Sequence, residues 1–426
     1  MGGIVRKIDR GRGIIYNHFM RKIIIIGGGA AGLIASATAA KRGEDVTVIE
    51  KNSRPARKVM ITGKGRCNVT NACFDLDDLI NSVVTNKRFM YSAFSSFMPY
   101  DTIALIEEMG VPTKIERGNR VFPESDKAVD IVDALVKNAK QNGVKFVEGT
   151  VTSFNTENNV IKSVNLADGT IVDGDAFAIC TGGLSYQSTG STGDGYKLAE
   201  SVGHSITDIE PALISLVASN GFVPKLQGLS LRNISIKLLD GEKEIYSDFG
   251  EMLFTHYGVS GPVILSASSH MTHPKEHNYK IVIDLKPALD EQTLDKRIQR
   301  DFAENTNKDF INSLSKLLPN KLIPVIVKVS GIEPSEKVNQ ITKPQRQNLV
   351  HLLKNFTVNI SDFRPINEAI ITSGGVDVKE INPKTMGSKI IDNLFFAGEV
   401  IDVDAYTGGF NLQVAFSTGY LCGMNI

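Results

Sequence analysis

The sequence lacks tryptophan and carries no excess charge of either sign. It has 47 Lys and Arg residues and 47 Asp and Glu residues, so the formal net charge is zero. Without a basic surplus, no long-range field attracts nucleic acid or an anionic membrane surface. No apolar run approaches the roughly 20 residues that a membrane-spanning helix needs. We therefore expect neither a nucleic-acid partner nor a membrane partner, and the sequence carries no signal for an oligomeric state.

Cysteine is also scarce, with four residues in 426: Cys67, Cys73, Cys180 and Cys422. They contain no C-x-x-C pair and are too few to staple a chain of this length, which fits a reducing compartment. We expect a cytoplasmic protein. Residues 1–19 carry basic side chains but no apolar stretch of the length that a secretory signal needs. They are interpreted as a disordered leader or a start-site artefact, with the fold beginning at Met20.

Glycine is abundant, and part of it forms a phosphate-binding pattern. Gly27, Gly29 and Gly32 make G-x-G-x-x-G between an apolar run (23–26) and an alanine-rich helical stretch (33–41). The first glycine allows a tight turn, the second admits a pyrophosphate, and the third lets the helix pack on the strand. The pattern predicts a dinucleotide-binding turn.

The surrounding sequence supports this prediction. Ala30 and Ala31 lie in the glycine turn, next to the N-terminus of the helical stretch, whose free N–H groups and positive dipole end favour phosphate. Residues 45–50 read as a second, parallel strand that ends at Glu50, where a carboxylate can accept hydrogen bonds from ribose hydroxyls. Strand, helix and strand within about thirty residues form a βαβ unit.

The C-terminal region decides between the possible dinucleotides. Residues 395–399 read as a buried strand that ends in Gly398 and Glu399, and a glycine turn at 407–409 opens the last helix. A carboxylate at a strand end can bind the ribityl chain of a flavin, and a helix N-terminus can stabilise negative charge on a reduced flavin ring. Nicotinamide needs neither feature, so we expect FAD as the resident cofactor.

Four further motifs resemble a known family. They are TGKGRCNVTN at 62–71, TGGLSY at 181–186 with STGSTG at 188–193, LFTHYGVSGP at 253–262, and AGE at 397–399 with TGGFN at 407–411. In this order they resemble the HI0933-like flavoprotein family, from about Met20 to the C-terminus. That family includes an aminoacetone oxidase and a bile-acid enone reductase. Two departures are Gln187, where relatives usually carry proline, and Gly387, where they usually carry glutamate.

The resemblance implies an α/β fold: a Rossmann-type FAD domain of the glutathione-reductase kind, with an inserted β-barrel-like domain and a small helical domain. The changes in sequence texture place the boundaries. We expect the leader at 1–19, the FAD domain at 20–207 and 357–426, the β-rich insertion at 208–288 and the helical insertion at 289–356.

The resemblance also implies a set of cofactor contacts. Arg66 and Asn68 are expected in a flavin loop, Val151 as a backbone partner of the adenine, and residues 181–183 close to the cofactor. A surface ion pair is the competing role for Arg66. With the glycine turns, the cofactor set is Gly27, Gly29, Ala30, Ala31, Gly32, Glu50, Lys51, Gly65, Arg66, Cys67, Asn68, Val151, Thr181, Gly182, Gly183, Gly398, Glu399, Gly409, Phe410, Asn411 and Leu412.

The catalytic residues are less well defined. His256 could act as a general acid or base, and Tyr186 and Tyr406 as proton donors, but loop and packing roles compete for all three. Cys67 and Cys73 could form a redox pair, although their spacing is longer than in disulfide reductases of similar fold. His270, His273 and His277 lack the Cys or carboxylate partners of a metal site, so we expect no metal.

The sequence as a whole predicts an FAD-dependent oxidoreductase that transfers a hydride between bound flavin and a small organic substrate. We expect the substrate between the FAD domain and the β-rich insertion, since clefts between domains commonly bind small ligands. Two directions stay open: a reductase with NAD(P)H as transient donor, and a flavin-dependent amine oxidase that uses oxygen. A module in which FAD is structural, binding RNA or a partner, is a third alternative.

Overall fold

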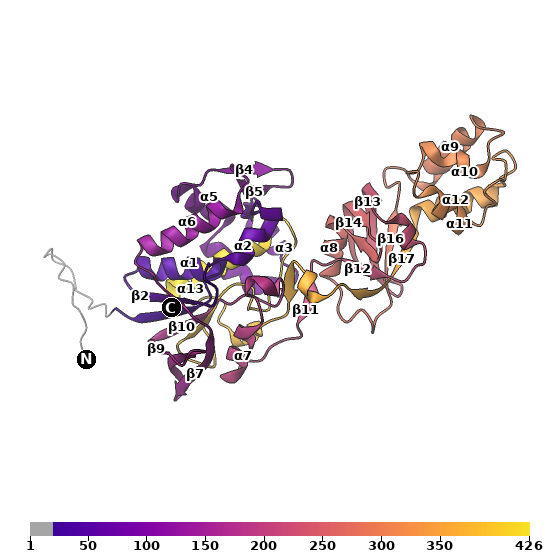
Figure 1. Ribbon diagram of the computed structural model, residues 1–426. Helices are drawn as coiled ribbons and strands as arrows, with labels where there is room; N and C mark the ends of the chain where they lie inside the picture. Colours follow the sequence, from indigo (N-terminus) through magenta and orange to yellow (C-terminus); the bar gives the residue numbers. More distant parts are fainter. Residues whose placement is uncertain (1–19) are drawn as a thin grey trace. The chain divides into compact units, whose positions relative to one another are not determined.

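The computed structural model describes residues 20–426, so the expected leader at 1–19 lies outside the described residues. The chain divides into two compact units (Figure 1). One contains the chain up to Glu210 together with Ile371–Ile426, and the other contains Pro211–Ile370. Both ends of the described chain therefore belong to the same unit, with the second unit inserted between its halves.

The first unit is built on a five-stranded parallel sheet in the order β19-β10-β1-β2-β6. Residues 23–26 are all buried, so both faces of the strand are covered, as expected for a parallel strand with helices on both sides of the sheet. The Rossmann-type α/β fold is confirmed. The strands are β1 (Lys22–Ile26), β2 (Asp45–Glu50), β6 (Lys145–Glu148), β10 (Ala176–Ile179) and β19 (Leu394–Phe396).

Two helices far apart in sequence pack together beside this sheet: α1 (Ala30–Lys41) and α13 (Phe410–Asn425). Their backbones approach so closely that a Cβ on Gly419 would lie 2.5 Å from the carbonyl oxygen of Ala31. A Cβ on Gly423 would meet the Ala35 oxygen at the same distance. Glycine at these two positions lets the last helix lie against the first.

Smaller elements surround the sheet in the first unit. A three-stranded antiparallel sheet has the order β3-β5-β4, and another has the order β7-β8-β9. The bounds are α2 (Arg57–Ile61), η1 (Thr62–Gly65), β3 (Thr70–Asn71), α3 (Leu76–Asn81), η2 (Lys87–Met90), α4 (Tyr91–Ser96), α5 (Pro99–Glu108), β4 (Thr113–Glu116), β5 (Arg120–Pro123), α6 (Ala128–Gln141), β7 (Val151–Glu157), β8 (Val160–Leu166), β9 (Ile171–Asp173), η3 (Gln187–Thr189), α7 (Asp194–Ser201), β18 (Ile371–Ser373) and η7 (Val378–Glu380).

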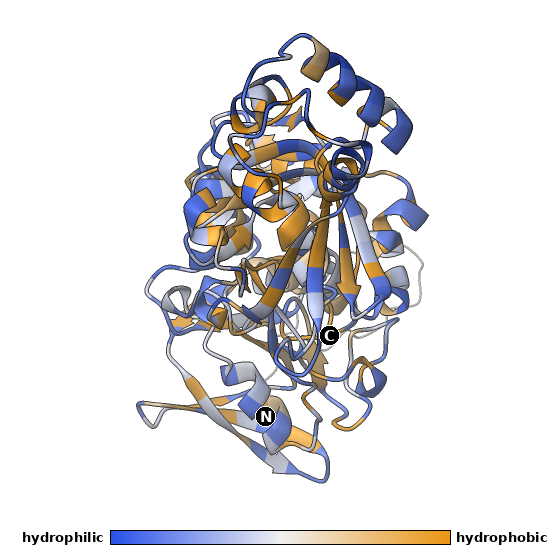
Figure 2. Ribbon diagram, turned by 90° about the vertical axis from the view of Figure 1, so that its right-hand side faces the viewer, coloured by the Kyte–Doolittle hydropathy of each residue, from blue (hydrophilic) through white to orange (hydrophobic). Residues whose placement is uncertain are grey.

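The second unit is a closed six-stranded barrel with a helical module inserted into it. Hydrophobic and hydrophilic segments alternate along its strands (Figure 2), as expected where one strand face lines a core. The strands are β12 (Leu216–Ala218), β13 (Ser230–Asp240), β14 (Lys243–Phe254), β15 (Gly258–Ser260), β16 (Tyr279–Asp284) and β17 (Phe356–Phe363); β11 (Glu210–Ala212) lies where the chain passes from the first unit into the second. The helices are η4 (Val223–Leu226), α8 (Pro262–Ser268), α9 (Glu291–Ala303), α10 (Phe310–Ser313), η5 (Leu314–Lys316), α11 (Ile323–Ser330), α12 (Lys343–Lys354) and η6 (Ile366–Glu368).

The domain boundary expected at residue 357 differs from this division. Strand β17 begins at Phe356 and pairs with both β12 and β16, so it closes the barrel. The helical module α9–α12 is therefore an insertion within the barrel, between β16 and β17. The chain returns to the first unit only at Ile371. The boundary was expected too early because the partners of β17 lie far away in sequence, and local sequence texture does not reveal them.

Candidate cofactor site

The glycine turn lies between β1 and α1 at the carboxyl edge of the sheet. Gly27 has a φ of 103°, and a Cβ on it would lie 2.6 Å from the Cys180 oxygen. A Cβ on Gly32 would lie 2.0 Å from the Gly27 oxygen. Gly29 differs, since the nearest atom to its added Cβ is 3.8 Å away. The fold itself therefore requires glycine at 27 and 32, whereas at 29 the protein leaves room that a pyrophosphate would fill.

Glu50 lies at the end of β2, and its two carboxylate oxygens accept hydrogen bonds from the glycine turn and from the residues that follow β2. Its Oε2 accepts a hydrogen bond from the Gly28 N–H at 2.8 Å. Its Oε1 accepts from the Asn52 N–H at 2.8 Å and from the Asn52 side-chain amide at 2.7 Å. The carboxylate thus lies beside the glycine turn, where a ribose would follow a pyrophosphate. The neighbouring Lys51 instead forms an ion pair of 2.6 Å with Asp194.

Glu399 is the centre of a polar network at the same edge of the sheet. Its Oε2 lies 2.6 Å from the Nζ of Lys58, and its Oε1 accepts from the Thr372 N–H at 2.9 Å. Lys58 also donates to the Ser185 hydroxyl at 2.6 Å. Gly183 is essential here, because an added Cβ would lie 2.5 Å from the Thr372 hydroxyl. Three segments that are far apart in sequence therefore meet at one carboxylate.

The turn before α13 is held from two sides. Gly409 has a φ of 103°, and a Cβ on it would lie 2.3 Å from the backbone of Thr70. The Asn411 side chain closes the turn by accepting from the Ala405 N–H at 2.9 Å and donating to the Ala405 oxygen at 2.7 Å. Phe410 and Leu412 complete the first turn of the helix. The free N–H groups of this helix start are thereby fixed in place.

Sequence reasoning missed the residue that anchors this helix. Gln413 is fully buried, and its Oε1 accepts from the hydroxyls of Thr70 at 2.6 Å and Thr102 at 2.8 Å. Its side-chain amide donates to the Phe97 oxygen at 3.0 Å. Only its place one turn after Gly409 could have suggested the role. Lys58 was missed likewise, although it lies in a basic stretch next to the expected flavin loop.

In the loop after η1, Arg66 turns toward acidic residues of its own unit. Its Nε lies 2.9 Å from a carboxylate oxygen of Asp126, and one terminal nitrogen lies 3.2 Å from Glu116. Its guanidinium stacks 4.1 Å over the ring of Phe122. The ion-pair role that competed with flavin contact is thus the one that the structure displays. Gly65, with a φ of 83°, has no atom within 4 Å of an added Cβ.

Asn68 and Cys67 occupy different environments in the same loop. The Asn68 Oδ1 is buried and accepts no hydrogen bond from a described residue, a state that buried polar atoms rarely keep unless a ligand or water supplies the partner. Cys67 is fully buried, and burial raises the pKa of its thiol to about 12. A protonated, enclosed thiol is a poor nucleophile, which disfavours a redox pair with Cys73.

The remaining expected contacts lie on neighbouring strands. Val151 begins β7 and is buried. It lies close to Gly149, whose N–H donates to the backbone carbonyl oxygen of Glu50 at 2.9 Å. Thr181 follows β10 directly, and its hydroxyl lies against Gly195 of α7, where an added Cβ would meet it at 2.1 Å. Gly182 adopts a φ of 73°, and the backbone of Gly398 turns at a φ of 80°. These residues border the same sheet edge as the glycine turn.

The three candidate catalytic residues are not brought together within one unit. His256 lies in the turn between β14 and β15 of the barrel, stacked edge-on against Tyr257. Tyr186 lies in the first unit at a φ of 51°, directly after Ser185. The backbone N–H of Tyr406 donates to the Ser82 carbonyl oxygen at 3.0 Å, and the backbone carbonyl oxygen of Tyr406 accepts from the Asn411 side-chain amide at 3.2 Å. Both tyrosines therefore belong to segments that border the candidate cofactor site.

A buried carboxyl group that sequence reasoning did not single out lies near Glu399. Asp404 is 1% exposed, and its Oδ1 accepts from the Ser373 hydroxyl at 3.3 Å. Burial raises the pKa of Asp404 to about 6, and the nearby charges of Asp402 and Glu399 add to this shift. Burial likewise raises the pKa of Asp402. Two neighbouring carboxyl groups, Asp402 and Asp404, therefore hold their protons more tightly than free aspartate does.

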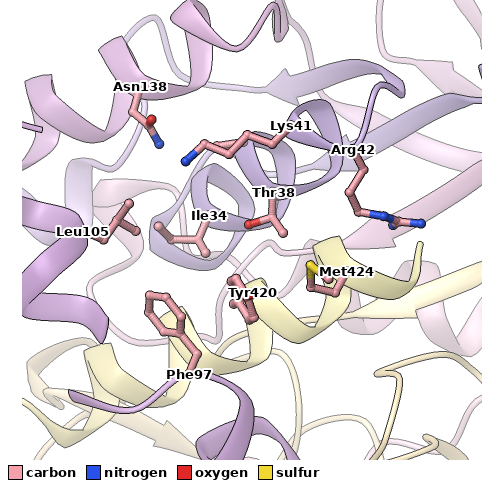
Figure 3. Close-up of a pocket in the computed structure, with 10 residues that line it drawn as sticks. Ile34, Thr38, Lys41, Arg42, Phe97, Leu105, Asn138, Tyr420 and Met424 are labelled. Atoms are coloured by element: carbon pink, nitrogen blue, oxygen red, sulfur yellow. The ribbon is translucent and has the colours of Figure 1, made fainter. Parts of the chain in front are cut away.

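One cavity of about 310 Å³ lies apart from these residues, on the other side of α1 (Figure 3). Its wall includes the ring pair Phe97 and Tyr420, whose centroids are 4.8 Å apart. Lys41 extends across it toward Asn138. None of the expected cofactor contacts lines this cavity, so the candidate site is defined by the sheet edge alone.

The comparison with known families settles the kind of protein. Residues 21–425 match the family model described as the HI0933-like protein Rossmann domain. The chain belongs to the HI0933-like family. It is an FAD-dependent oxidoreductase, and the expected resemblance is confirmed. The glycine turn with room at Gly29, the carboxylate of Glu50 and the unpartnered oxygen of Asn68 fit an FAD as resident cofactor.

Two relatives of this family member cover nearly its whole length. The 3-dehydro-bile acid delta(4,6)-reductase of Clostridium scindens is 29% identical over 411 residues, 95% of this chain and 98% of that protein. The ribosomal RNA dihydrouridine synthase of Haemophilus influenzae is 30% identical over 408 residues, with the same coverage of both chains.

Solved structures confirm the fold. The 3-ketosteroid-delta4-(5alpha)-dehydrogenase of Rhodococcus jostii RHA1, in complex with 4-androstene-3,17-dione, aligns over 97% of this chain and 98% of its own, with a TM-score of 0.52 and 16% identity. At this identity the likeness concerns the fold alone. Among residues 20–426, no helix is both long and apolar enough to cross a membrane.

Proposed function

We propose that this protein reduces a carbon–carbon double bond conjugated to a carbonyl group, with NAD(P)H as transient electron donor. The observation that carries the proposal is a shared bond chemistry. The two relatives, each of which aligns with this chain over 98% of its own length, are named for different substrates: a 3-dehydro-bile acid and ribosomal RNA. Saturating a delta(4,6)-unsaturated 3-oxo ring and converting uridine to dihydrouridine both reduce a ring double bond conjugated to a carbonyl.

The overall reaction balances as one hydride and one proton added across the double bond. NAD(P)H gives up a hydride and becomes NAD(P)⁺, the carbon β to the carbonyl receives a hydride, and the carbon α to it receives a proton from the protein or solvent. When bound, FAD would supply the two-electron redox chemistry that links donor and substrate. This chain must therefore hold the cofactor, accommodate negative charge near it and provide a proton.

The residues at the sheet edge fit these tasks. The fixed helix start at Gly409 offers positive dipole density and free N–H groups, which would stabilise negative charge that develops beside it. Lys58 supplies a cation held by Glu399 and Ser185. Tyr186 and Tyr406 remain our candidates for the proton donor in the first unit.

Anaerobic half-reactions test this proposal. Reduction of the bound flavin by NADPH or NADH, followed by reoxidation under nitrogen with a 3-oxo-4,6-diene steroid or with uridine-containing ribosomal RNA, is the expected result. The amine oxidase alternative predicts no bleaching by either nucleotide and fast reoxidation by oxygen after reduction by an amine. That outcome would overturn the reductase assignment.

A further inference from the structure

The β4–β5 hairpin of the first unit and the neighbouring turn η1 carry cations that the nearby acidic residues do not pair with. Turn η1 lies against the hairpin, since a Cβ on Gly63 would lie 3.3 Å from the Phe122 ring. Glu116 and Asp126 are both engaged by Arg66, and Lys114 shares Asp126 at 2.8 Å. Lys64, Arg117 and Arg120 are exposed, and none of them forms an ion pair with a residue in the described part of the chain. The zero net charge of the whole protein thus conceals a local group of three cations that form no ion pair with described residues, against the exposed carboxylate of Glu124. We call Lys64, Arg117 and Arg120 the cationic rim.

The cationic rim is attached directly to the candidate cofactor site. The side-chain amide of Asn71 donates to the Gly118 oxygen in the hairpin turn and to the Gly408 oxygen in the turn before α13, both at 3.0 Å. The Phe122 ring joins the other side, with Arg66 at 4.1 Å and Arg120 at 5.8 Å from its centroid. One asparagine therefore links the hairpin turn to the helix start that we assign to the cofactor.

Exposed aromatic rings continue this surface. The Ala72 N–H donates to the Asn119 oxygen at 2.7 Å, which fixes the chain after β3 against the hairpin turn. Two residues later Phe74 is 52% exposed and lies 6.3 Å from Tyr100, which is also 52% exposed. Large exposed rings beside unpaired cations are the combination that binds single-stranded nucleic acid, where bases stack on rings and cations follow the backbone.

We propose that the cationic rim (Lys64, Arg117 and Arg120) holds the phosphate backbone of an RNA substrate beside the cofactor site, with Phe74 and Tyr100 as a stacking surface for its bases. The inference rests on the proposed function and names its substrate class. The acidic first turn of α3, with Asp77 and Asp78, borders Phe74 and repels phosphate. We therefore place the bases of the RNA on Phe74 and Tyr100 and its phosphates along the hairpin. Three separate cations exceed what the single carboxylate of a bile acid needs.

Binding of an oligouridylate of about 20 nucleotides, measured between about 50 and 200 mM salt, tests the inference. The holoprotein is compared with the triple variant Lys64→Gln, Arg117→Gln, Arg120→Gln. Each lost phosphate contact lowers the slope of log affinity against log salt by about 0.7, so the triple variant should lose about 2 from the slope. Phe74→Ala should weaken binding about tenfold at every salt concentration and leave the slope unchanged.

Two matched variants control the measurement. Lys328→Gln removes an exposed lysine on α11 and should leave affinity and slope unchanged. The conservative double variant Arg117→Lys, Arg120→Lys, with Lys64 retained, should keep most of the slope, because lysine also neutralises phosphate. FAD content of each variant reports intact folding.

Three outcomes would overturn the inference: no binding of the oligouridylate by the wild-type protein, an unchanged slope in the glutamine variant, or an equal loss of slope in Lys328→Gln. The proposed function fails separately. A wild-type protein that is not reoxidised anaerobically by any conjugated carbonyl compound would refute the reductase, whatever the salt slope shows.

Discussion

Lys58 and Glu399, separated by 341 positions in sequence, form an ion pair of 2.6 Å at the carboxyl edge of the parallel sheet. Each side chain is 21% exposed, so water screens the pair only in part. The Ser185 hydroxyl and the Thr372 N–H complete the hydrogen bonding of the carboxylate. The pair joins α2 to the C-terminal half of the first unit, beside the candidate cofactor site.

Replacing Lys58 with methionine should lower the free energy of unfolding by about 1 to 3 kcal/mol, because it leaves a half-buried carboxylate without its cation. Urea denaturation of the apoprotein measures this. The matched control is Arg54→Gln, which removes an exposed ion pair with Asp133 and should cost under about 0.5 kcal/mol. Equal losses in the two variants would contradict a structural role for the pair with Glu399.

Two glycines of the turn should respond differently to alanine. Gly32→Ala places a Cβ 2.0 Å from the Gly27 oxygen, so it should destabilise the protein with or without cofactor. Gly29→Ala meets no atom closer than 3.8 Å, so the apoprotein should keep its melting temperature while FAD occupancy falls. Thermal melts of apoprotein and holoprotein distinguish the two. Full FAD occupancy in Gly29→Ala would show that the pyrophosphate lies elsewhere.

Glu50→Gln should reduce FAD affinity about tenfold, since a neutral amide is a weaker acceptor for ribose hydroxyls and for the Gly28 N–H. Glu148→Gln is the matched control, because Glu148 is the exposed register partner of Glu50 on β6. Titration of apoprotein with FAD, followed by flavin fluorescence, measures both. Unchanged affinity in Glu50→Gln would mean that the ribose contact is assigned wrongly.

Asp404 should make the protein less stable as pH rises from about 4 to about 6. Its native pKa of about 6 exceeds the ordinary value of 3.8, so the native state binds this proton more tightly than the unfolded state over that range. Stability from this group is complete below the unfolded pKa and is lost, by about 2 to 3 kcal/mol, as pH passes through the native pKa. Urea denaturation across this range should show a flatter pH dependence for Asp404→Asn than for wild type. The exposed control Asp133→Asn should keep the wild-type dependence.

The sequence predicted those parts of the molecule in which neighbours along the chain determine structure. The βαβ unit from Lys22 to Glu50 follows from an apolar strand, three glycines and a helical stretch, and the structure confirms the fold that it predicts. The closing of the barrel by β17 could not be read in the same way. Its partners β12 and β16 lie across the helical module, so local texture places a boundary where long-range hydrogen bonds place a strand.

The same distinction between local and long-range determinants applies to the candidate site. Motif spacing identified the glycine turns and both carboxylates, because their backbone conformations depend on local residues. It did not identify the partners of those carboxylates. Lys58 reaches Glu399 and Gln413 joins Thr70 to Thr102 only because the fold brings distant segments together. Arg66 likewise has acidic partners 50 and 60 positions away, which no local pattern indicates.

Anaerobic reoxidation of the reduced protein by a conjugated double bond tests the central claim most directly. After reduction by NADPH or NADH, addition of a 3-oxo-4,6-diene steroid or of uridine-containing ribosomal RNA under nitrogen should restore the absorbance of oxidised flavin. The substrate should gain two hydrogens, as mass spectrometry would show. If neither compound restores the flavin band and only oxygen does so, the protein is not a double-bond reductase and the account is contradicted.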